Sequence, residues 1–145
     1  MNPDAETIQS TILLARSLVN EMTNEEVVER EVLEDQVLLS MMMILSDITR
    51  SCFLVNKKLL ALVSARMTTL TVKRGLSKHS AHGLCVFGET LCSNGGDENG
   101  HRVGQLSLDL LEKMNEKESK PFASAFCLRK MILALVIALN HCFFK

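Results

Sequence analysis

Apolar side chains recur along this chain at the three- and four-residue spacing of helices that bury one face. The first such stretch predicts a helix that Asn2 caps, with Pro3 in its first turn, and that ends near Met22. The acidic residues Asp4 and Glu6 lie near its start, where the helix dipole favours them. Its expected buried face comprises Ile8, Ile12, Ala15, Leu18, Val19 and Met22.

A second helix is predicted from a capping box that begins at Thr23 and is expected to run to Leu45. It starts polar and becomes apolar on all sides from Val37 onward, as expected of a helix at the centre of a core. Within this stretch stand three consecutive methionines, Met41, Met42 and Met43. They are expected to fill the core, with an adaptable binding face as the alternative.

Four further helices complete the expected set. Asn56 caps the third helix, which stops at Gly75. The fourth is expected to begin at Ser77, the fifth at Asp97 and the sixth between Glu118 and Pro121. The apolar stripe of the third comprises Leu59, Val63, Met67 and Leu70. No stretch alternates with the two-residue period of a strand. The sequence therefore predicts an all-α protein of about six helices, arranged as stacked antiparallel hairpins.

Small residues in the fourth and fifth expected helices are spaced as two tightly packed antiparallel helices require. Gly88 precedes Gly100 by twelve positions, and Ser107 follows seven positions later. Gly96 lies in the turn, and Gly104 extends the row of small residues on the second helix. A glycine inside a helix costs about 1 kcal/mol relative to alanine, so close packing is expected to compensate. The alternative is two helices that merely contain glycine.

This hairpin and the residues before it resemble a known family, the tetratricopeptide-like helical region of very large signalling proteins. In those proteins a serine/threonine-kinase-like domain and an AAA-type ATPase domain precede the helices, and GAF and histidine-kinase domains often follow. The matching residues are Lys73, Gly75, Ser77, Ser80, Ala81, Leu91, Cys92, Gly96, Asp97, Gly100, Gly104, Gln105, Leu106, Ser107, Leu108, Leu110, Leu111, Glu112 and Lys113. The resemblance implies a non-catalytic protein-interaction or linker module of a signal-transduction ATPase or kinase, of which this chain is a fragment.

The resemblance fades after Glu118, which sets the expected domain boundary. Residues 1–118 are expected to form a helical-repeat domain, with its clearest hairpin at 77–115, and residues 119–145 a C-terminal apolar helix or truncated tail.

Nine consecutive apolar residues run from Met131 to Leu139 within that last segment, whereas a bilayer span needs roughly 20. As a cap on the stack, this segment would bury Leu133, Val136 and Ile137; as a foreign tail, it would promote self-association. We expect a foreign tail, so that a chain lacking residues 121–145 is more soluble than the full chain and equally stable. An alternative function is an independent small helical protein docked to a membrane or partner through the segment from Met131 to Phe144.

Composition agrees with one domain of 145 residues, with two prolines and no tryptophan or tyrosine. The net charge of -1 gives no overall attraction to nucleic acid or an anionic membrane. Five cysteines without a C-x-x-C pair, and an acidic N-terminus without a secretory signal, predict a reduced, cytoplasmic chain.

Charge is unevenly distributed along the chain. Seven acids lie between Glu21 and Asp35, but none between Ile48 and Gly88. The second stretch holds the residues of a candidate basic docking surface: Lys57, Lys58, Arg66, Lys73, Arg74 and Lys78. That surface would suit an acidic protein partner better than nucleic acid, because no aromatic residues alternate with the cations. The other interpretation is a set of solvated helix faces.

Catalytic and cofactor motifs are absent from the sequence. Without a phosphate-binding G-x-x-x-x-G-K-[ST] loop or the H-R-D and D-F-G motifs of kinases, neither an enzyme nor a cofactor is expected. His79, His82 and Cys85 recur every three residues, but this spacing drifts around a helix and supplies too few ligands for zinc. Cys92 and His101 flank one turn without a third catalytic group. No metal or catalytic site is therefore expected.

Overall fold

The computed structural model describes residues 4–93 and 98–114, and within these ranges the protein is all-α. The six helices are α1 (Ala5–Asn20), α2 (Asn24–Val28), α3 (Gln36–Val55), α4 (Lys57–Arg74), α5 (Ser80–Ser93) and α6 (Glu98–Met114). The all-α class expected from the sequence is thus confirmed. The expected last helix, near residues 118–121 and beyond, lies outside the described residues.

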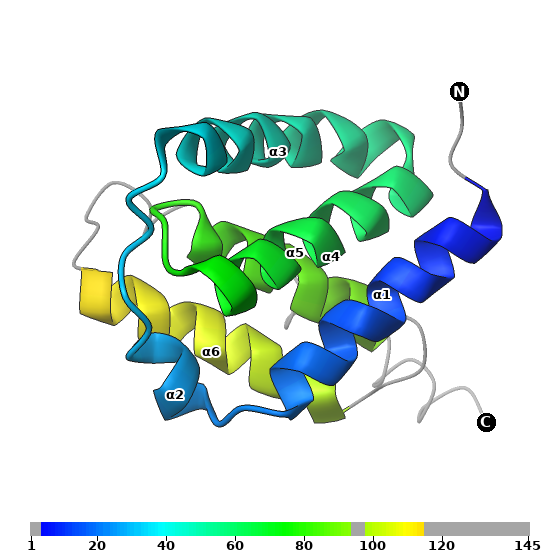
Figure 1. The fold of residues 1–145 in the computed structure, drawn as a ribbon. Coiled ribbons are helices and arrows are strands. Elements are labelled where there is room, and N and C mark those ends of the chain that lie inside the picture. Colours follow the sequence, from blue (N-terminus) through cyan, green and yellow to red (C-terminus); the bar gives the residue numbers. More distant parts are fainter. Residues whose placement is uncertain (1–3, 94–97, 115–145) are drawn as a thin grey trace.

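Consecutive helices from α3 to α6 lie against one another in order (Figure 1). Figure 1 shows α3 on one side of the molecule, α4 and α5 in the middle and α6 on the other side, with the chain reversing direction at each connection. α1 crosses α4, and the short α2 contacts α6. The α3–α4 hairpin and the α5–α6 hairpin therefore contact each other through α4 and α5, and α3 forms an outer layer.

Local capping determines where several helices begin. The carboxylate of Asp4 accepts from the amide of Thr7 at 2.6 Å and caps α1, so the expectation that Asn2 does so is wrong. Thr23 forms the expected capping box, in which Thr23 and Glu26 exchange backbone-to-side-chain bonds. Asn56 caps α4 as expected, accepting from the amide of Leu59 at 3.0 Å.

The fourth expected helix begins three residues later than its sequence signal. Its start was expected at Ser77, whereas α5 begins at Ser80. The Ser77 hydroxyl instead accepts from the amide of His79, and its carbonyl accepts from the amide of Ser80. Ser77 therefore shapes the turn that leads into the helix.

The continuous helix expected from Thr23 to Leu45 is wrong. α2 ends at Val28, and the linker of residues 29–35 pairs instead with Leu76, just past the end of α4. The amide of Leu33 donates to the carbonyl of Leu76 at 2.7 Å, and the amide of Leu76 donates to the carbonyl of Glu31 at 2.8 Å. These tertiary bonds replace helical ones, and Asp35 then caps a new helix by accepting from two amides of its first turn.

Gly75 makes this backbone pairing sterically feasible. Its φ of +124° lies in a region that residues with a side chain rarely adopt. A Cβ placed on Gly75 would lie 2.6 Å from the carbonyl oxygen of Glu31. The residue expected only to stop a helix therefore also admits the neighbouring linker.

The main core lies between α1, α2, α4, α5 and α6, without α3. Its largest fully buried members include Phe87, Leu84, Leu106 and Leu110. α3 adds only to two small clusters, one around Met42 with residues of α4 and one around Cys52 with residues of α4 and α5.

The expectation that the second apolar stretch is central is therefore wrong. Met42 is buried, but Met41 and Met43 remain 43% and 46% exposed. Of the three methionines, only Met42 fills the core. The reason is that α1 takes the other side of α4, so α3 has neighbours on one side only.

Candidate interaction surface

The α5–α6 hairpin is closely packed where Gly88 and Gly100 meet. A Cβ on Gly88 would lie 2.9 Å from the carbonyl oxygen of Gly100 and 3.0 Å from the amide nitrogen of Gly104. A Cβ on Gly100 would lie 2.9 Å from both the amide of Cys92 and the carbonyl oxygen of Gly88. Both contacts are with backbone atoms, which cannot rotate away. These two glycines therefore allow the helices to approach.

Gly104 takes a different role from that expected, whereas Ser107 lies between the helices as expected and adds a hydrogen bond. A Cβ on Gly104 would meet nothing within 4 Å, so the expectation that this position has no room for a side chain is wrong. Only the backbone of Gly104 faces Gly88. Ser107 is buried, and its hydroxyl donates to the carbonyl of Ala81 on α5 at 2.7 Å. The remaining expected packing residue, Gly96, lies outside the described residues.

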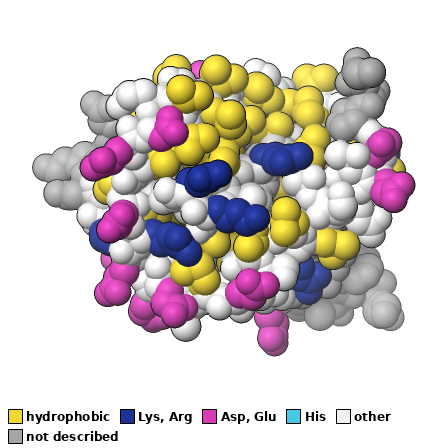
Figure 2. All heavy atoms as spheres, in the orientation of Figure 1, with side chains coloured by type: hydrophobic (Ala, Val, Ile, Leu, Met, Phe, Trp, Pro, Cys, Tyr) yellow, Lys and Arg dark blue, Asp and Glu magenta, His cyan; other side chains and the backbone are white. Residues whose placement is uncertain are grey.

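The outer side of α3 carries a row of residues, all but one of them apolar, at alternating spacings of four and three. The row comprises Val37, Met41, Ile44, Ile48, Ser51 and Val55, and we call it the α3 seam. Val37, Ile44 and Val55 are 71%, 55% and 87% exposed, whereas Ile48 is half-buried. Figure 2 shows hydrophobic side chains gathered over α3 on this face.

A second row with the same spacing lies beside the seam and faces the protein. It comprises Leu38, Met42, Leu45, Thr49 and Cys52, all buried or half-buried. Such spacing keeps one helix in register with a neighbouring helix that runs nearly alongside it. α3 therefore carries two adjacent helix-packing rows, of which α4 and α5 occupy one.

α3 is also the one helix in the described part of the chain that is long and apolar enough to cross a membrane. Length and composition do not separate a spanning helix from one that docks on protein. The exposed side of α3 carries Asp47 and Arg50, whose side chains form an ion pair at 3.9 Å.

All six residues of the candidate basic docking surface are exposed. Five of them lie on α4, and the sixth, Lys78, lies in the turn before α5. Figure 2 shows Lys and Arg side chains gathered over α4, directly beside the hydrophobic side chains over α3. The structure thus brings a basic row and an apolar row together on one face, which sequence analysis did not anticipate.

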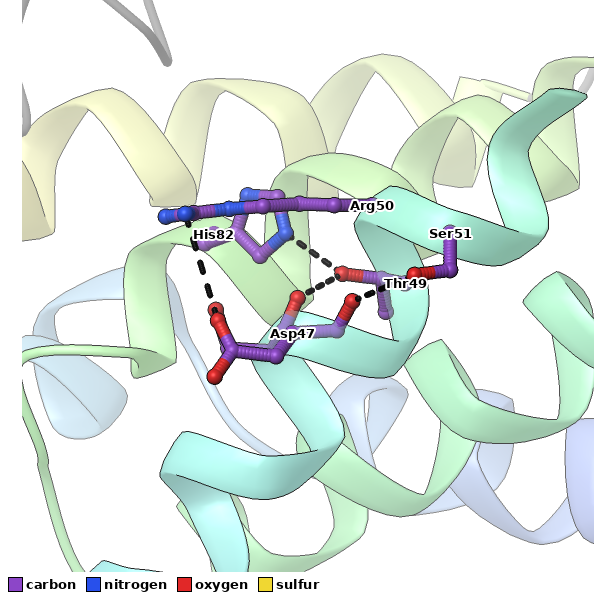
Figure 3. A network of polar contacts seen from close by, with 6 residues as sticks. Asp47, Thr49, Arg50, Ser51 and His82 are labelled. Atoms are coloured by element: carbon purple, nitrogen blue, oxygen red, sulfur yellow. Dashed lines mark hydrogen bonds and ion pairs between the residues drawn. The ribbon is translucent and has the colours of Figure 1, made fainter.

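A polar contact joins α3 to α5 on the other side of α3 (Figure 3). Thr49 Oγ1 lies 2.6 Å from the carbonyl of Ser46 and 2.7 Å from Nε2 of His82. Because the carbonyl can only accept, Thr49 donates to it, and Nε2–H of His82 donates to Thr49. The neutral imidazole therefore carries its proton on Nε2.

Burial, together with the positive charges of Arg50 and His79, lowers the pKa of His82 from 6.5 to about 4. Figure 3 shows Arg50 extending from α3 toward His82. A ring held neutral in this way supports helix packing and is a poor candidate for acid–base chemistry near neutral pH.

The histidines and cysteines considered as ligands do not assemble into a metal site. Across residues 4–93 and 98–114, no group of three or more His, Cys, Asp or Glu side chains could hold a metal ion. The ring of His82 is hydrogen-bonded to Thr49, and the side chain of Cys85 is buried. Cys92 packs against Gly100, while His101 is exposed.

Two important features were missed by sequence analysis. The α3 seam was visible in the printed residues as a four-three spacing, but the all-round apolar character of the stretch concealed it. Arg102 makes four hydrogen bonds to the end of α1 and the residues after it, and no local signal marks it.

Comparisons with protein-family models, with curated proteins and with solved structures give no match for this chain.

Proposed function

We propose that this protein is a non-catalytic interaction or linker module that docks a protein partner along the α3 seam. The exposure of that seam carries the proposal. Burying one Val, Leu, Ile or Met side chain contributes about 1.5–3 kcal/mol, so a partner that covers four such residues gains several kcal/mol. Monomeric proteins seldom leave a row of this kind in water.

The wider signalling context rests on the family resemblance. Four consecutive antiparallel helices with close glycine contacts support a repeat-like arrangement of hairpins. In a multidomain signalling ATPase or kinase, such a module would hold or relay between neighbouring domains. The catalytic motifs missing from this chain would then belong to other domains.

Photocrosslinking in the cells that produce the protein tests the proposal. A photoreactive residue at position 41, on the seam, should form protein adducts, whereas one at position 10, exposed on α1, should not. A second substitution, Ile44→Glu, should abolish the adducts at 41 without changing thermal stability, because Ile44 is largely exposed.

Adducts at 41 that survive Ile44→Glu, or none at 41 in a folded protein, would contradict the proposal. Flotation with lipid vesicles that is lost on deleting residues 121–145 would support the alternative, docking to a membrane through the C-terminal apolar segment.

A further inference from the structure

The outer ridge of α4 carries cations at a regular spacing. It comprises Lys58, Leu62, Arg66, Thr69 and Lys73, and we call it the α4 ridge. Its three cations are exposed, while Leu62 and Thr69 are half-buried. Steps of three and four residues place all five on one side of the helix.

The α4 ridge lies next to the α3 seam. Ile48 of the seam packs into the cluster that holds Met42, together with Leu59 and Leu70 of α4. Leu59 is adjacent in sequence to Lys58, and both leucines are half-buried. These half-buried leucines therefore lie between the apolar seam and the basic ridge. Figure 2 shows Lys and Arg side chains beside hydrophobic ones on this face.

The positive charge of the ridge is not balanced by acids on its own helix, since no acidic residue occurs from Ile48 to Gly88. The acidic linker of residues 29–35 pairs with Leu76, just past the end of α4. Lys58 lies 16 residues before Arg74, or about 24 Å along the helix, and so is far from that linker. The cations at Lys58 and Arg66 thus remain available to an external anion.

We infer that the occupant of this face is an amphipathic helix of a partner protein, with an apolar stripe against the α3 seam and acidic residues against the α4 ridge. This inference rests on the proposed function and specifies the partner's chemistry. The four-three spacing of the seam calls for a helix, and the unbalanced cations call for acids along one flank of it.

Charge and helix length disfavour two occupants from this chain itself. Residues 121–145 contain Arg129, Lys130 and Lys145 and no acidic residue, so they would add like charge to the ridge. A second copy offers its dense acids between Glu21 and Asp35, where the only complete helix, α2, has five residues and cannot span the 20 of α3.

Three synthetic helical peptides test the inference with the full chain. All share one apolar heptad stripe, and their flanking positions carry Glu, Gln or Lys. Fluorescence anisotropy in 50 mM salt should show the Glu peptide binding about tenfold more tightly than the Gln peptide, with the Lys peptide weakest. The preference should shrink about tenfold in 500 mM salt, where the Debye length falls to a few Å.

Charge-reversal variants localise the effect. The double variant Lys58→Glu/Arg66→Glu should reverse the preference, so that the Lys peptide binds more tightly than the Glu peptide. Gln105→Glu is the control, because Gln105 is exposed on α6, on the side of the molecule away from α3; it should change each affinity less than twofold. Ile44→Glu should weaken all three peptides at least tenfold.

Equal affinity of the Glu and Gln peptides, or no binding of the Glu peptide, would overturn the inference. If Ile44→Glu still abolished the crosslinks at position 41, the proposed function would survive that failure. Wild-type protein that floats with phosphatidylserine vesicles, or that dimerises by light scattering, and loses this behaviour in the double variant would also overturn it, in favour of a membrane or a second copy.

Discussion

Arg102 on α6 donates a hydrogen bond of 2.7 Å to the backbone carbonyl of Val19 on α1, 83 residues earlier in the chain. The same guanidinium also donates to the carbonyl of Met22 and to the side chains of Asn20 and Asn24. The last carbonyls of a helix have no partner within it and carry partial negative charge. Arg102 thus completes the end of α1 and fixes it to the far hairpin.

Removing this guanidinium should loosen α1. Arg102→Ala is expected to lower the free energy of unfolding by about 2–3 kcal/mol, because its hydrogen bonds from a charged donor to the carbonyls of Val19 and Met22 are lost. Arg102→Lys should retain only part of the lost stability, since an ammonium cannot reproduce the planar arrangement of guanidinium donors. Urea denaturation measures both; an Arg102→Ala protein as stable as the exposed control Arg66→Ala would contradict this role.

The glycines of the α5–α6 hairpin should respond to alanine in opposite directions. Gly88→Ala and Gly100→Ala should each lower the free energy of unfolding by about 1–3 kcal/mol, because the added methyl meets backbone atoms. Gly104→Ala adds a methyl in open space and should raise it by up to about 1 kcal/mol through helix propensity. Thermal melting of the three variants decides the matter, and equal shifts at all three would exclude the close-packing explanation.

Sequence alone located Gly88 and Gly100 correctly because a missing side chain at a packing spacing is a local signal. It could not separate them from Gly104, since which side of a glycine faces the neighbouring helix depends on the crossing of the two helices. The break between α2 and α3 was missed for a similar reason. Only the tertiary pairing of Leu33 with Leu76 reveals it.

Ser107 should contribute through its hydroxyl as well as its small size. Ser107→Ala removes the buried bond to the Ala81 carbonyl and should cost about 1 kcal/mol. Ser10→Ala is the control, because Ser10 makes a similar bond to a carbonyl at an exposed position and should change stability by less than about 0.5 kcal/mol. If chemical denaturation shows the same loss of stability for both variants, the hydroxyl of Ser107 makes no contribution beyond that of its small size.

His82 should make the protein less stable in mild acid. The folded-state pKa of about 4 lies below the unfolded value of 6.5, so between these pH values the unfolded chain binds a proton that the folded protein does not. Above pH 6.5 both forms are neutral and the group has no effect. As the pH falls from 6.5 to 4, stability should fall by roughly 2–3 kcal/mol on this account.

The variant His82→Gln isolates this effect, because the carboxylates that also titrate in this range are common to both proteins. The loss of stability between pH 7 and pH 4.5 should be smaller in the variant. If the free energy of unfolding changes equally with pH in the two proteins, or if NMR shows the imidazole titrating near 6.5 in the folded state, this role of His82 is refuted.

The attachment of α3 through two small clusters, outside the main core, implies an uneven distribution of stability. A unit held by few buried contacts opens more often than the rest of a domain. Amide hydrogens of α3 should therefore exchange with solvent faster than those of α5 and α6, through openings in which the larger core stays folded. A bound partner would suppress these openings, so that the protection of α3 from exchange would report directly on whether the surface is occupied.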